Sequence, residues 1–230
     1  MSNEHEDGPV RTIGFIGSGS IGSTLARLAV AAGYDVVMSN SRGPETLGDL
    51  ATELGPHARA ADVPSAAAAG DVVVVTIPLY AIHSLPADAF TGKLVVDTCN
   101  YYPGRDGEIQ ELEEETITTS ELVQRHLVGA TVVKGFNNLG FRSLGTLART
   151  TGDPDRTALP IAGDDERAKA TVIELLDSLG YDSLDAGPLA EGWRFQRDTP
   201  VYVQPYAEGR PVGVAIVRTL LAEARRYRDM

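Results

Sequence analysis

A six-residue glycine-rich segment, GSGSIG at residues 17–22, constrains this chain more than any other feature. It follows an apolar, β-branched run at residues 12–16 that predicts a buried strand. It precedes residues 21–32, where apolar side chains recur at helical spacing until Gly33. A strand, a glycine loop and a helix in immediate succession predict the start of a dinucleotide-binding fold, because this context makes the G-x-G-x-x-G pattern specific.

Each glycine of the loop meets a separate physical need. Gly17 permits a tight turn, Gly19 lacks a Cβ and so admits a pyrophosphate, and Gly22 allows close packing of the helix on the strand. The helix N-terminus adds free N–H groups and a partial positive charge. We therefore predict that the phosphates of a dinucleotide bind to Gly17, Ser18, Gly19, Ser20, Ile21 and Gly22.

Predicted strands and helices alternate along most of the chain. Further strands are expected at residues 34–38, 71–77, 93–98, 131–136 and 159–162, and further helices at 44–54, 63–69, 108–126 and 165–179. The run DVVVVTI at 71–77 is apolar on both faces, as central parallel strands are. The pattern predicts an α/β protein of the Rossmann type, with a doubly wound, mainly parallel sheet and a short C-terminal helical appendage.

Three segments of unequal size are expected. Residues 1–10 are predicted to be a disordered lead-in, residues 11–187 an NADP-binding Rossmann domain, and residues 188–230 a small segment that covers a bound acceptor or contacts a second subunit. A terminal helix is expected at 212–229. Its apolar stripe needs a partner surface, which predicts a homodimer. The stripe comprises Val212, Ile216, Val217, Leu220, Leu221 and Ala224.

Charge and cysteine content exclude several classes of protein. The formal net charge of −12 repels nucleic acids and anionic membrane surfaces. No apolar run approaches the roughly 20 residues of a membrane helix. Cys99 is the sole cysteine, which rules out an intramolecular disulfide, and no histidine pair has metal-site spacing. We expect a cytoplasmic protein without a metal, a nucleic-acid partner or a membrane partner.

The end of the second predicted strand indicates which dinucleotide is bound. An enzyme that uses NAD usually carries an acidic residue about 20 positions after the glycines, where it binds the ribose 2′-hydroxyl. This chain has no acidic residue between Val36 and Pro44 and offers Asn40, Ser41 and Arg42 instead. A guanidinium suits a 2′-phosphate. We predict NADP(H); the alternative is a solvated arginine in a turn.

Polar and turn-forming residues follow three more predicted strands. They sit at the carboxyl ends of parallel strands, where open α/β sheets bind ligands. The amide of Asn137 could bind the nicotinamide carboxamide or a ribose, and the alternative for each asparagine is a role in a turn. The candidates are Thr76, Ile77, Pro78, Leu79, Asn100 and Asn137.

Seven segments in order carry a family resemblance: GFIGSGSIG, NSRGPETL, VVVVTIP, DTCNYYPGRDG, VVKGFNNLG, PIAGDDERAKATV and DAGPL. Together they resemble the NADPH-dependent deazaflavin reductases, which move hydride between NADP(H) and an 8-hydroxy-5-deazaflavin, coenzyme F420. The resemblance spans about residues 11–190. It implies that residues 18–21 hold the pyrophosphate, that Ser41 and Arg42 hold the 2′-phosphate, and that residues 77–79 border the nicotinamide ribose. Phe136 and Asn137 would lie beside the nicotinamide, with the acceptor flat against it.

The segment KGFNNLGF at 134–141 departs from this family. It is similar to the NADPH domain of the six-transmembrane metalloreductases, which pass hydride to a flavin, so a flavin is an alternative acceptor. A dehydrogenase acting on a small molecule would usually add a large helical domain, but only about 40 residues follow Gly187. A non-catalytic sensor of NADPH is a further alternative.

Hydride transfer between two stacked rings needs little acid–base help, because the chemistry belongs to the cofactors. The protein must hold the reacting atoms about 3–3.5 Å apart and aligned. We therefore expect no catalytic side chain. Trp193 and Arg197 could cover a planar anionic acceptor by stacking and cation–π contact, or they could pack internally or contact a second subunit. Lys134 is either a proton donor or a structural lysine.

Overall fold

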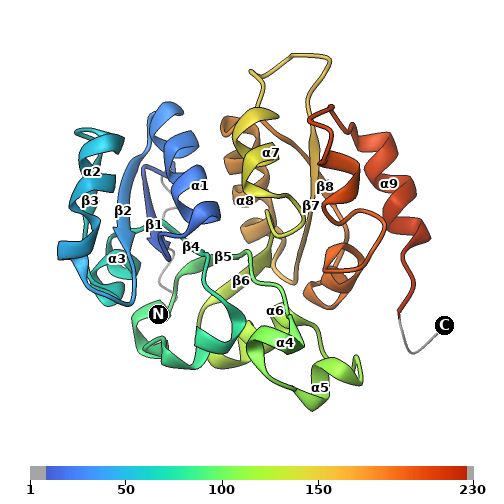
Figure 1. Ribbon diagram of the computed structural model, residues 1–230, viewed down its shortest axis with the longest axis horizontal. Coiled ribbons are helices and arrows are strands. Elements are labelled where there is room, and N and C mark those ends of the chain that lie inside the picture. The colour runs from blue at the N-terminus through green and yellow to red at the C-terminus, as the bar shows by residue number, and fades with distance from the viewer. Residues whose placement is uncertain (1–8, 227–230) are drawn as a thin grey trace, which may run out of the picture.

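The structure is a computed structural model that describes residues 9–226. Most of the predicted lead-in, residues 1–8, lies outside the described residues. The fold is built on an eight-stranded sheet with the order β3-β2-β1-β4-β5-β6-β7-β8 (Figure 1). Neighbouring strands are parallel except for β6 and β7, which are antiparallel. The mainly parallel Rossmann-type sheet predicted from the sequence is confirmed.

The strands are β1 (Thr12–Ile16), β2 (Asp35–Ser39), β3 (Ala58–Ala60), β4 (Val72–Val75), β5 (Leu94–Asp97), β6 (Thr131–Lys134), β7 (Ala158–Gly163) and β8 (Asp182–Asp185). The order reverses at β1, which pairs with β2 on one side and with β4 on the other. Ligands of doubly wound sheets bind at such a switch point, beyond the carboxyl ends of the strands.

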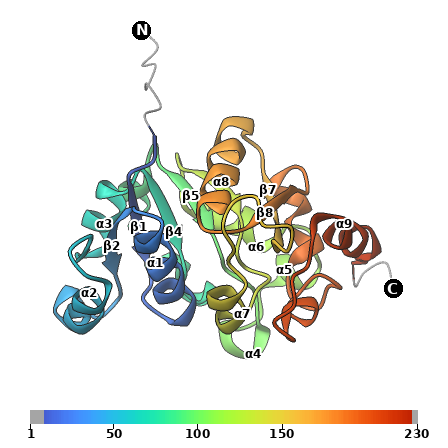
Figure 2. The same ribbon diagram turned by 90° about the horizontal axis from the view of Figure 1, so that it is seen from above.

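The α-helices are α1 (Ser20–Ala31), α2 (Gly48–Leu54), α3 (Val63–Ala69), α4 (Pro103–Asp106), α5 (Gln110–Glu113), α6 (Thr119–His126), α7 (Phe141–Thr146), α8 (Glu166–Ser178) and α9 (Val214–Glu223). Short 3₁₀ helices are η1 (Pro44–Leu47), η2 (Leu79–Ser84), η3 (Ala87–Phe90), η4 (Leu189–Phe195) and η5 (Gln204–Tyr206). Viewed from above, helices lie on both sides of the sheet (Figure 2).

The four valines of β4 explain why this strand is apolar throughout. Val72 and Val74 belong to the core cluster that also contains residues of α1 and α8. Val73 and Val75 belong to the cluster on the opposite face, with residues of α3 and α6. Alternate side chains of a strand point to opposite faces, so a sheet covered on both faces needs apolar residues at every position. Full burial of each valine stabilises the fold by roughly 1.5–3 kcal/mol.

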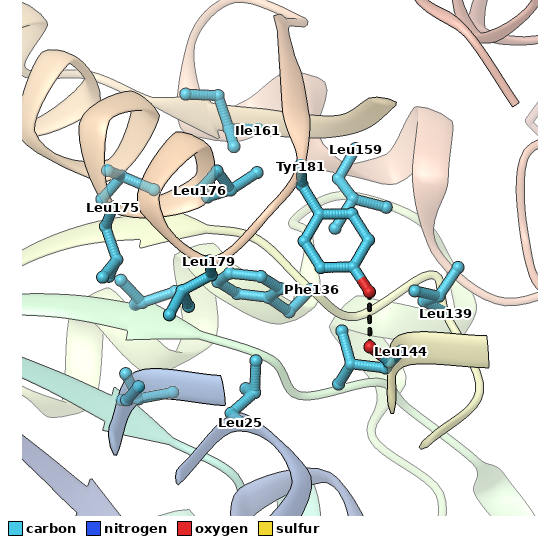
Figure 3. Packing of buried hydrophobic residues seen from close by; sticks show 14 of the residues in the cluster. Leu25, Phe136, Leu139, Leu144, Leu159, Ile161, Leu175, Leu176, Leu179 and Tyr181 are labelled. Atoms are coloured by element: carbon cyan, nitrogen blue, oxygen red, sulfur yellow. Dashed lines mark hydrogen bonds between the residues drawn. The ribbon is translucent and has the colours of Figure 1, made fainter. Parts of the chain in front are cut away.

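An aromatic pair stands at the centre of the larger core (Figure 3). Phe136 meets Tyr181 edge to face, with ring centroids 6.5 Å apart. The Tyr181 hydroxyl donates a hydrogen bond to the backbone carbonyl of Leu144 in α7. Burial raises the pKa of Tyr181, so the phenol stays protonated and remains a donor. This bond connects α7 to the short segment between α8 and β8.

The continuous helix predicted at residues 108–126 is wrong. The chain forms α5 and α6, separated by a turn in which Glu115 has a left-handed φ of 52°. The second helix starts at a capping box, because the Thr118 side chain accepts from the backbone N–H of Glu121 and the Glu121 carboxylate accepts from that of Thr118. Thr-x-x-Glu is a sequence signal for this start.

The C-terminal segment packs onto the same core as the rest of the chain. Val201, Tyr206, Val217 and Leu221 are buried in the larger cluster, and α9 contacts β7 and β8. The predicted terminal helix ends early, at Glu223, and residues 227–229 lie outside the described residues. Most of its apolar stripe is buried within the chain, whereas Ile216 is 53% exposed. The stripe therefore gives less reason for a second subunit than the sequence indicated, and the homodimer stays a prediction. Within residues 9–226, no helix has the length and apolarity to cross a membrane.

Candidate functional site

The glycine loop joins β1 to α1 beside the end of β4. Gly17 has a φ of +113°, and a Cβ there would lie 2.5 Å from the carbonyl oxygen of Thr76. A Cβ on Gly22 would lie 2.2 Å from the carbonyl oxygen of Gly17. The Thr76 hydroxyl donates to that same carbonyl at 2.9 Å. These contacts leave room only for glycine, and they hold α1 close to the carboxyl ends of β1 and β4.

Gly19 differs from the other two glycines because a Cβ there would meet nothing within 4 Å. Gly19 is also the N-cap of α1, and no side chain caps this helix end. The first N–H groups of a helix lack partners inside the helix. Open space next to free N–H groups at the start of a 12-residue helix fits an anion such as a pyrophosphate.

The turn after β2 is shaped by Asn40. Its side-chain nitrogen donates to Thr46 Oγ1 at 2.9 Å and reaches Ser18 Oγ at 3.4 Å, and its Oδ1 accepts from the backbone N–H of Arg42 at 2.8 Å. Ser41 and Arg42 are exposed. No described residue forms an ion pair with the Arg42 guanidinium. Asn40 therefore orders the turn, while the guanidinium is available to a ligand.

A cleft of about 410 Å³ extends from the glycine loop past the ends of β4, β5 and β6. Its volume lies within the range of roughly 300–1,000 Å³ that is usual for small-molecule sites. The structure thus brings the glycine loop and the ends of three strands to one site. The predicted site residues that line the cleft are Gly19, Ser20, Ile21, Thr76, Ile77, Pro78, Asn100, Phe136 and Asn137.

Asn137 carries an unused acceptor at the cleft. Its amide nitrogen donates to Asn100 Oδ1 at 3.1 Å and to the carbonyl oxygen of Phe195 at 2.8 Å. These two acceptors fix the orientation of the amide. Its Oδ1 is buried, and no described group donates a hydrogen bond to it. An unsatisfied buried acceptor costs about 1–3 kcal/mol, so this oxygen is a good candidate to accept a hydrogen bond from a ligand.

Three predicted site residues have side chains that are engaged within the fold. The Phe136 ring is 1% exposed and packs in the larger core, and its backbone has a left-handed φ of 57° (Figure 3). The residue nevertheless lines the cleft, so its place beside the nicotinamide stays a prediction. The Leu79 side chain is 1% exposed and packs in the smaller core. Asn100 lines the cleft, but its amide is bonded to Asn137, so it supports that residue.

Two tyrosines that the sequence did not indicate form the outer wall of the cleft. Tyr102 and Tyr202 are joined by a hydrogen bond between their hydroxyls, and both also line an adjoining pocket of about 680 Å³. Burial raises the pKa of Tyr202, which keeps this phenol neutral. Next to it, Val203 has a left-handed φ of 58°. This conformation is strained for a β-branched residue, and such strain is concentrated at functional sites.

Tyr102 is held in place by Asp106 at the end of α4. The Asp106 carboxylate accepts from the backbone N–H groups of Tyr102 at 2.8 Å and Tyr80 at 3.3 Å, and it pairs with Arg105 at 2.8 Å. Burial alone raises the pKa of Asp106, but the guanidinium and the N–H groups outweigh burial and lower it below the ordinary value of 3.8. A sequence signal existed for Tyr102, since it follows Asn100 at the carboxyl end of a predicted strand.

Trp193 and Arg197, the residues considered as a cover for the acceptor, are both absent from the lining of the cleft. The Arg197 guanidinium lies 5.6 Å from the centre of the Tyr102 ring and so reaches the outer wall of the cleft. Trp193 does not line the cleft. It stacks with Arg194 at 4.6 Å and with Arg226 at 4.9 Å. Together with Arg197 it lines a separate pocket. Internal packing, one of the alternatives considered for Trp193, describes its position.

Comparison with known proteins agrees with this geometry. Residues 12–101 match the family described as NADP oxidoreductase, coenzyme F420-dependent. A hypothetical protein of Sinorhizobium meliloti has 30% sequence identity and a TM-score of 0.73, with coverage of 84% of this chain and 93% of that chain. The chain belongs to this NADP oxidoreductase family. A member of known structure from Arthrobacter sp. FB24, which carries the name F420-dependent NADP-reductase, has 25% identity and a TM-score of 0.64, with coverage of 78% and 85%.

A curated relative has a different acceptor in its name. The metalloreductase STEAP3 of Rattus norvegicus is 31% identical over 180 residues, which are 77% of this chain and 34% of the relative. The chain therefore spans about a third of the length of that protein. Family membership makes this chain an NADP-dependent oxidoreductase, and the sequence prediction of that class is confirmed.

Proposed function

We propose that this oxidoreductase transfers hydride between NADP(H) and a deazaflavin coenzyme of the F420 type stacked on the nicotinamide. The observation that carries the proposal is the open space at Gly19 beside the uncapped N-terminus of α1, at one end of a cleft lined by Asn137. The buried Oδ1 of Asn137 has no hydrogen-bond donor among the described residues. A dinucleotide bound at the helix start extends naturally along this cleft, because the carboxyl ends of β1, β4, β5 and β6 form one continuous edge.

Each part of the dinucleotide has a matching group on the chain. The N–H groups at residues 19–21 receive the pyrophosphate, and Arg42 together with Ser41 receives the 2′-phosphate of the adenosine ribose. Ile77 and Pro78 form the wall beside the nicotinamide ribose, and Asn137 Oδ1 accepts from the nicotinamide carboxamide. Bound NADPH supplies the hydride itself.

The chain contributes alignment and exclusion of water. Ile77, Pro78 and Phe141 give the cleft apolar surface, and the Tyr102–Tyr202 bridge closes its outer wall. An acceptor ring in the space between them would face the nicotinamide, and hydride transfer would require the two reacting atoms to lie about 3–3.5 Å apart and aligned. Reduction of the acceptor takes up one proton together with the hydride, and the expectation that no side chain of this chain acts as a catalyst stays a prediction.

Two observations bear on the acceptor. The family description and the name of the Arthrobacter protein favour coenzyme F420. The similarity to STEAP3 agrees with the resemblance of residues 134–141 to the metalloreductases. Because that resemblance implies hydride transfer to a flavin, a flavin is the second candidate. Both acceptors are planar, tricyclic and able to stack, so the cleft is compatible with each.

Turnover with a panel of acceptors distinguishes these possibilities. Purified protein is mixed with NADPH or NADH and with F420, FMN, FAD or riboflavin, and oxidation is followed by absorbance. Oxidation of NADPH with F420, at a rate well above that with any flavin, supports the proposal. Oxidation with a flavin instead assigns the second candidate. No oxidation with the panel, or with carbonyl and imine compounds, contradicts an enzymatic role and favours a sensor of NADPH.

The proposal also includes the cellular location and the oligomeric state of the protein. We expect a cytoplasmic protein, since Cys99 is buried and unpaired and the chain carries strong negative charge. We also expect a homodimer, for which the exposed Ile216 is the main part of the apolar stripe of the C-terminal helix that is left to contact a second subunit. Light scattering that gives 24.4 kDa, the mass of one chain, would contradict the homodimer.

A further inference from the structure

A buried ion pair lies behind the cleft, at the ends of two neighbouring strands. Asp97 ends β5 and Lys134 ends β6, the two residues are partners in the strand register, and both side chains are fully buried. Lys134 Nζ lies 3.8 Å from Asp97 Oδ2. Removing two charges from water costs several kcal/mol per ion, and well-packed apolar residues often stabilise a fold equally well or better. A contribution to stability alone therefore does not explain why two charged side chains are buried here.

Both members of the pair bind the backbone of Cys99. Lys134 Nζ donates to the carbonyl oxygen of Cys99 at 3.0 Å, and the Cys99 N–H donates to Asp97 Oδ1 at 2.9 Å. Ser120 completes the network, because its hydroxyl donates to Asp97 Oδ2 at 2.6 Å and accepts from Lys134 at 3.1 Å. The peptide groups on both sides of Cys99 are fixed in this way, and Asn100 is the next residue along the chain.

Asn100 connects this hydrogen-bond network to Asn137. Its side-chain nitrogen donates to the carbonyl oxygen of Asn137 at 2.8 Å, and its Oδ1 accepts from the Asn137 amide at 3.1 Å. A continuous series of hydrogen bonds thus connects the buried ion pair to the free oxygen of Asn137. Neither Asp97 nor Lys134 is among the residues that line the cleft.

The surroundings keep the lysine in one position. A Cβ on Gly192 would lie 2.8 Å from Lys134 Cδ, so η4 packs directly on the lysine stem. Burial lowers the pKa of Lys134, and Asp97 opposes that effect. Burial also raises the pKa of the Cys99 thiol, which stays protonated and donates to the carbonyl oxygen of Ile77 at 3.3 Å.

We propose that Lys134 and Asp97 are positioning residues that fix Asn100 and, through it, the Asn137 amide at the nicotinamide end of the cleft. The assignment rests on the proposed function, since the target of Asn137 is the nicotinamide carboxamide. It replaces the idea of Lys134 as a proton donor, because the ammonium group lies behind Cys99. A purely structural pair would stabilise the fold without affecting the nicotinamide half of the cofactor selectively.

The test compares two ligands that share the adenosine end. NADPH reaches the nicotinamide site, whereas 2′,5′-ADP carries the 2′-phosphate but lacks the nicotinamide. The double variant Asp97→Asn/Lys134→Met removes both charges, leaves no buried charge unpaired and keeps an acceptor for the Cys99 N–H. Calorimetry measures both affinities, and thermal unfolding establishes that the variant is folded. Ser120→Ala is a milder second variant that keeps both charges.

The double variant should bind NADPH about 3- to 10-fold more weakly, the equivalent of losing one well-oriented hydrogen bond. Its affinity for 2′,5′-ADP should change less than 2-fold, and Ser120→Ala should shift the ratio in the same direction by less. Adding Asn137→Ala to the double variant should cost little more, because coupled residues are not additive. Lys169→Met removes a buried lysine that pairs with Asp185 away from the cleft and should leave the ratio unchanged.

Three results would overturn the assignment. If the folded double variant lost affinity for NADPH and for 2′,5′-ADP by the same factor, Lys134 and Asp97 would have a structural role only. Unchanged affinities would remove its influence on the cleft. If Asn137→Ala and the double variant reduced NADPH affinity additively, the ion pair would act independently of Asn137. Wild-type protein that binds 2′,5′-ADP no more weakly than NADPH, or that binds neither, would contradict the proposed function itself and the assignment with it.

Discussion

Replacement of Arg42 by alanine tests the preference for NADP(H) quantitatively. The guanidinium is exposed and has no ion-pair partner among the described residues, so its loss removes no contact inside the fold. The backbone N–H of residue 42 still donates to Asn40 Oδ1, which preserves the turn. A hydrogen bond to a charged group contributes about 1.5–3 kcal/mol. Arg42→Ala should therefore weaken NADPH binding about 10- to 150-fold, toward the lower end because exposed charges are screened.

Calorimetric titration of NADPH and NADH at low and high salt measures this effect. NADH affinity should be unchanged, the melting temperature should stay the same, and the loss for NADPH should shrink as salt rises. Arg218→Ala is the matched control, because Arg218 is an exposed arginine on α9, at the opposite end of the sheet from β2 and β3 (Figure 1). An NADPH affinity that survives the Arg42 change, or a parallel loss for NADH, would refute the assignment of Arg42 to the 2′-phosphate.

Three further predictions follow from single contacts. Gly19→Ala should leave the melting temperature unchanged but weaken NADPH binding at least tenfold. Gly22→Ala should also lower the melting temperature, because its Cβ would lie 2.2 Å from a backbone oxygen. Equal melting temperatures for the two variants would contradict this prediction. Tyr181→Phe should lower the free energy of unfolding in urea by about 1–3 kcal/mol, since the Leu144 carbonyl loses its donor, and an unchanged urea midpoint at equal slope would show that this bond contributes nothing. Asp106 has a lowered pKa, so its stabilising contribution is present above pH 3.8 and is lost as the pH falls through the folded-state pKa. The difference in unfolding free energy between wild type and Asp106→Asn should therefore be constant near neutral pH and shrink below about pH 4. A difference that is independent of pH would exclude the ionised carboxylate as its source.

The sequence predicted the first half of the fold well because its signals there are local. A glycine loop between a strand and a helix has one common structural meaning, and a run such as VVVV at residues 72–75 is typical of a strand covered on both faces. Two edge strands, β3 and β8, were not predicted. They are short, ARA and DSLD, and the side chains of both are partly exposed, so neither shows apolar periodicity.

The details of the site depended on geometry that no local rule provides. Phe136 and Asn137 are adjacent and both line the cleft, but the Phe136 ring is almost fully buried in the larger core. The left-handed backbone of Phe136 is a feature that no sequence pattern indicated. The contribution of Tyr202 depends on how the C-terminal segment folds back over the sheet, which is a tertiary contact between residues 100 positions apart. The ion pair of Asp97 and Lys134 could have been expected from two strand ends in register, once the strand order was known.

The central claim is that a dinucleotide lies along the carboxyl edge of the sheet, with its pyrophosphate at the start of α1. Electron density from a crystal soaked with NADP⁺ tests this claim most directly. The account predicts pyrophosphate oxygens within hydrogen-bond distance of the N–H groups of residues 19–21, the 2′-phosphate at Arg42, and the carboxamide at Asn137 Oδ1. Density for the dinucleotide elsewhere on the protein, or at this edge with its two ends exchanged, would contradict it.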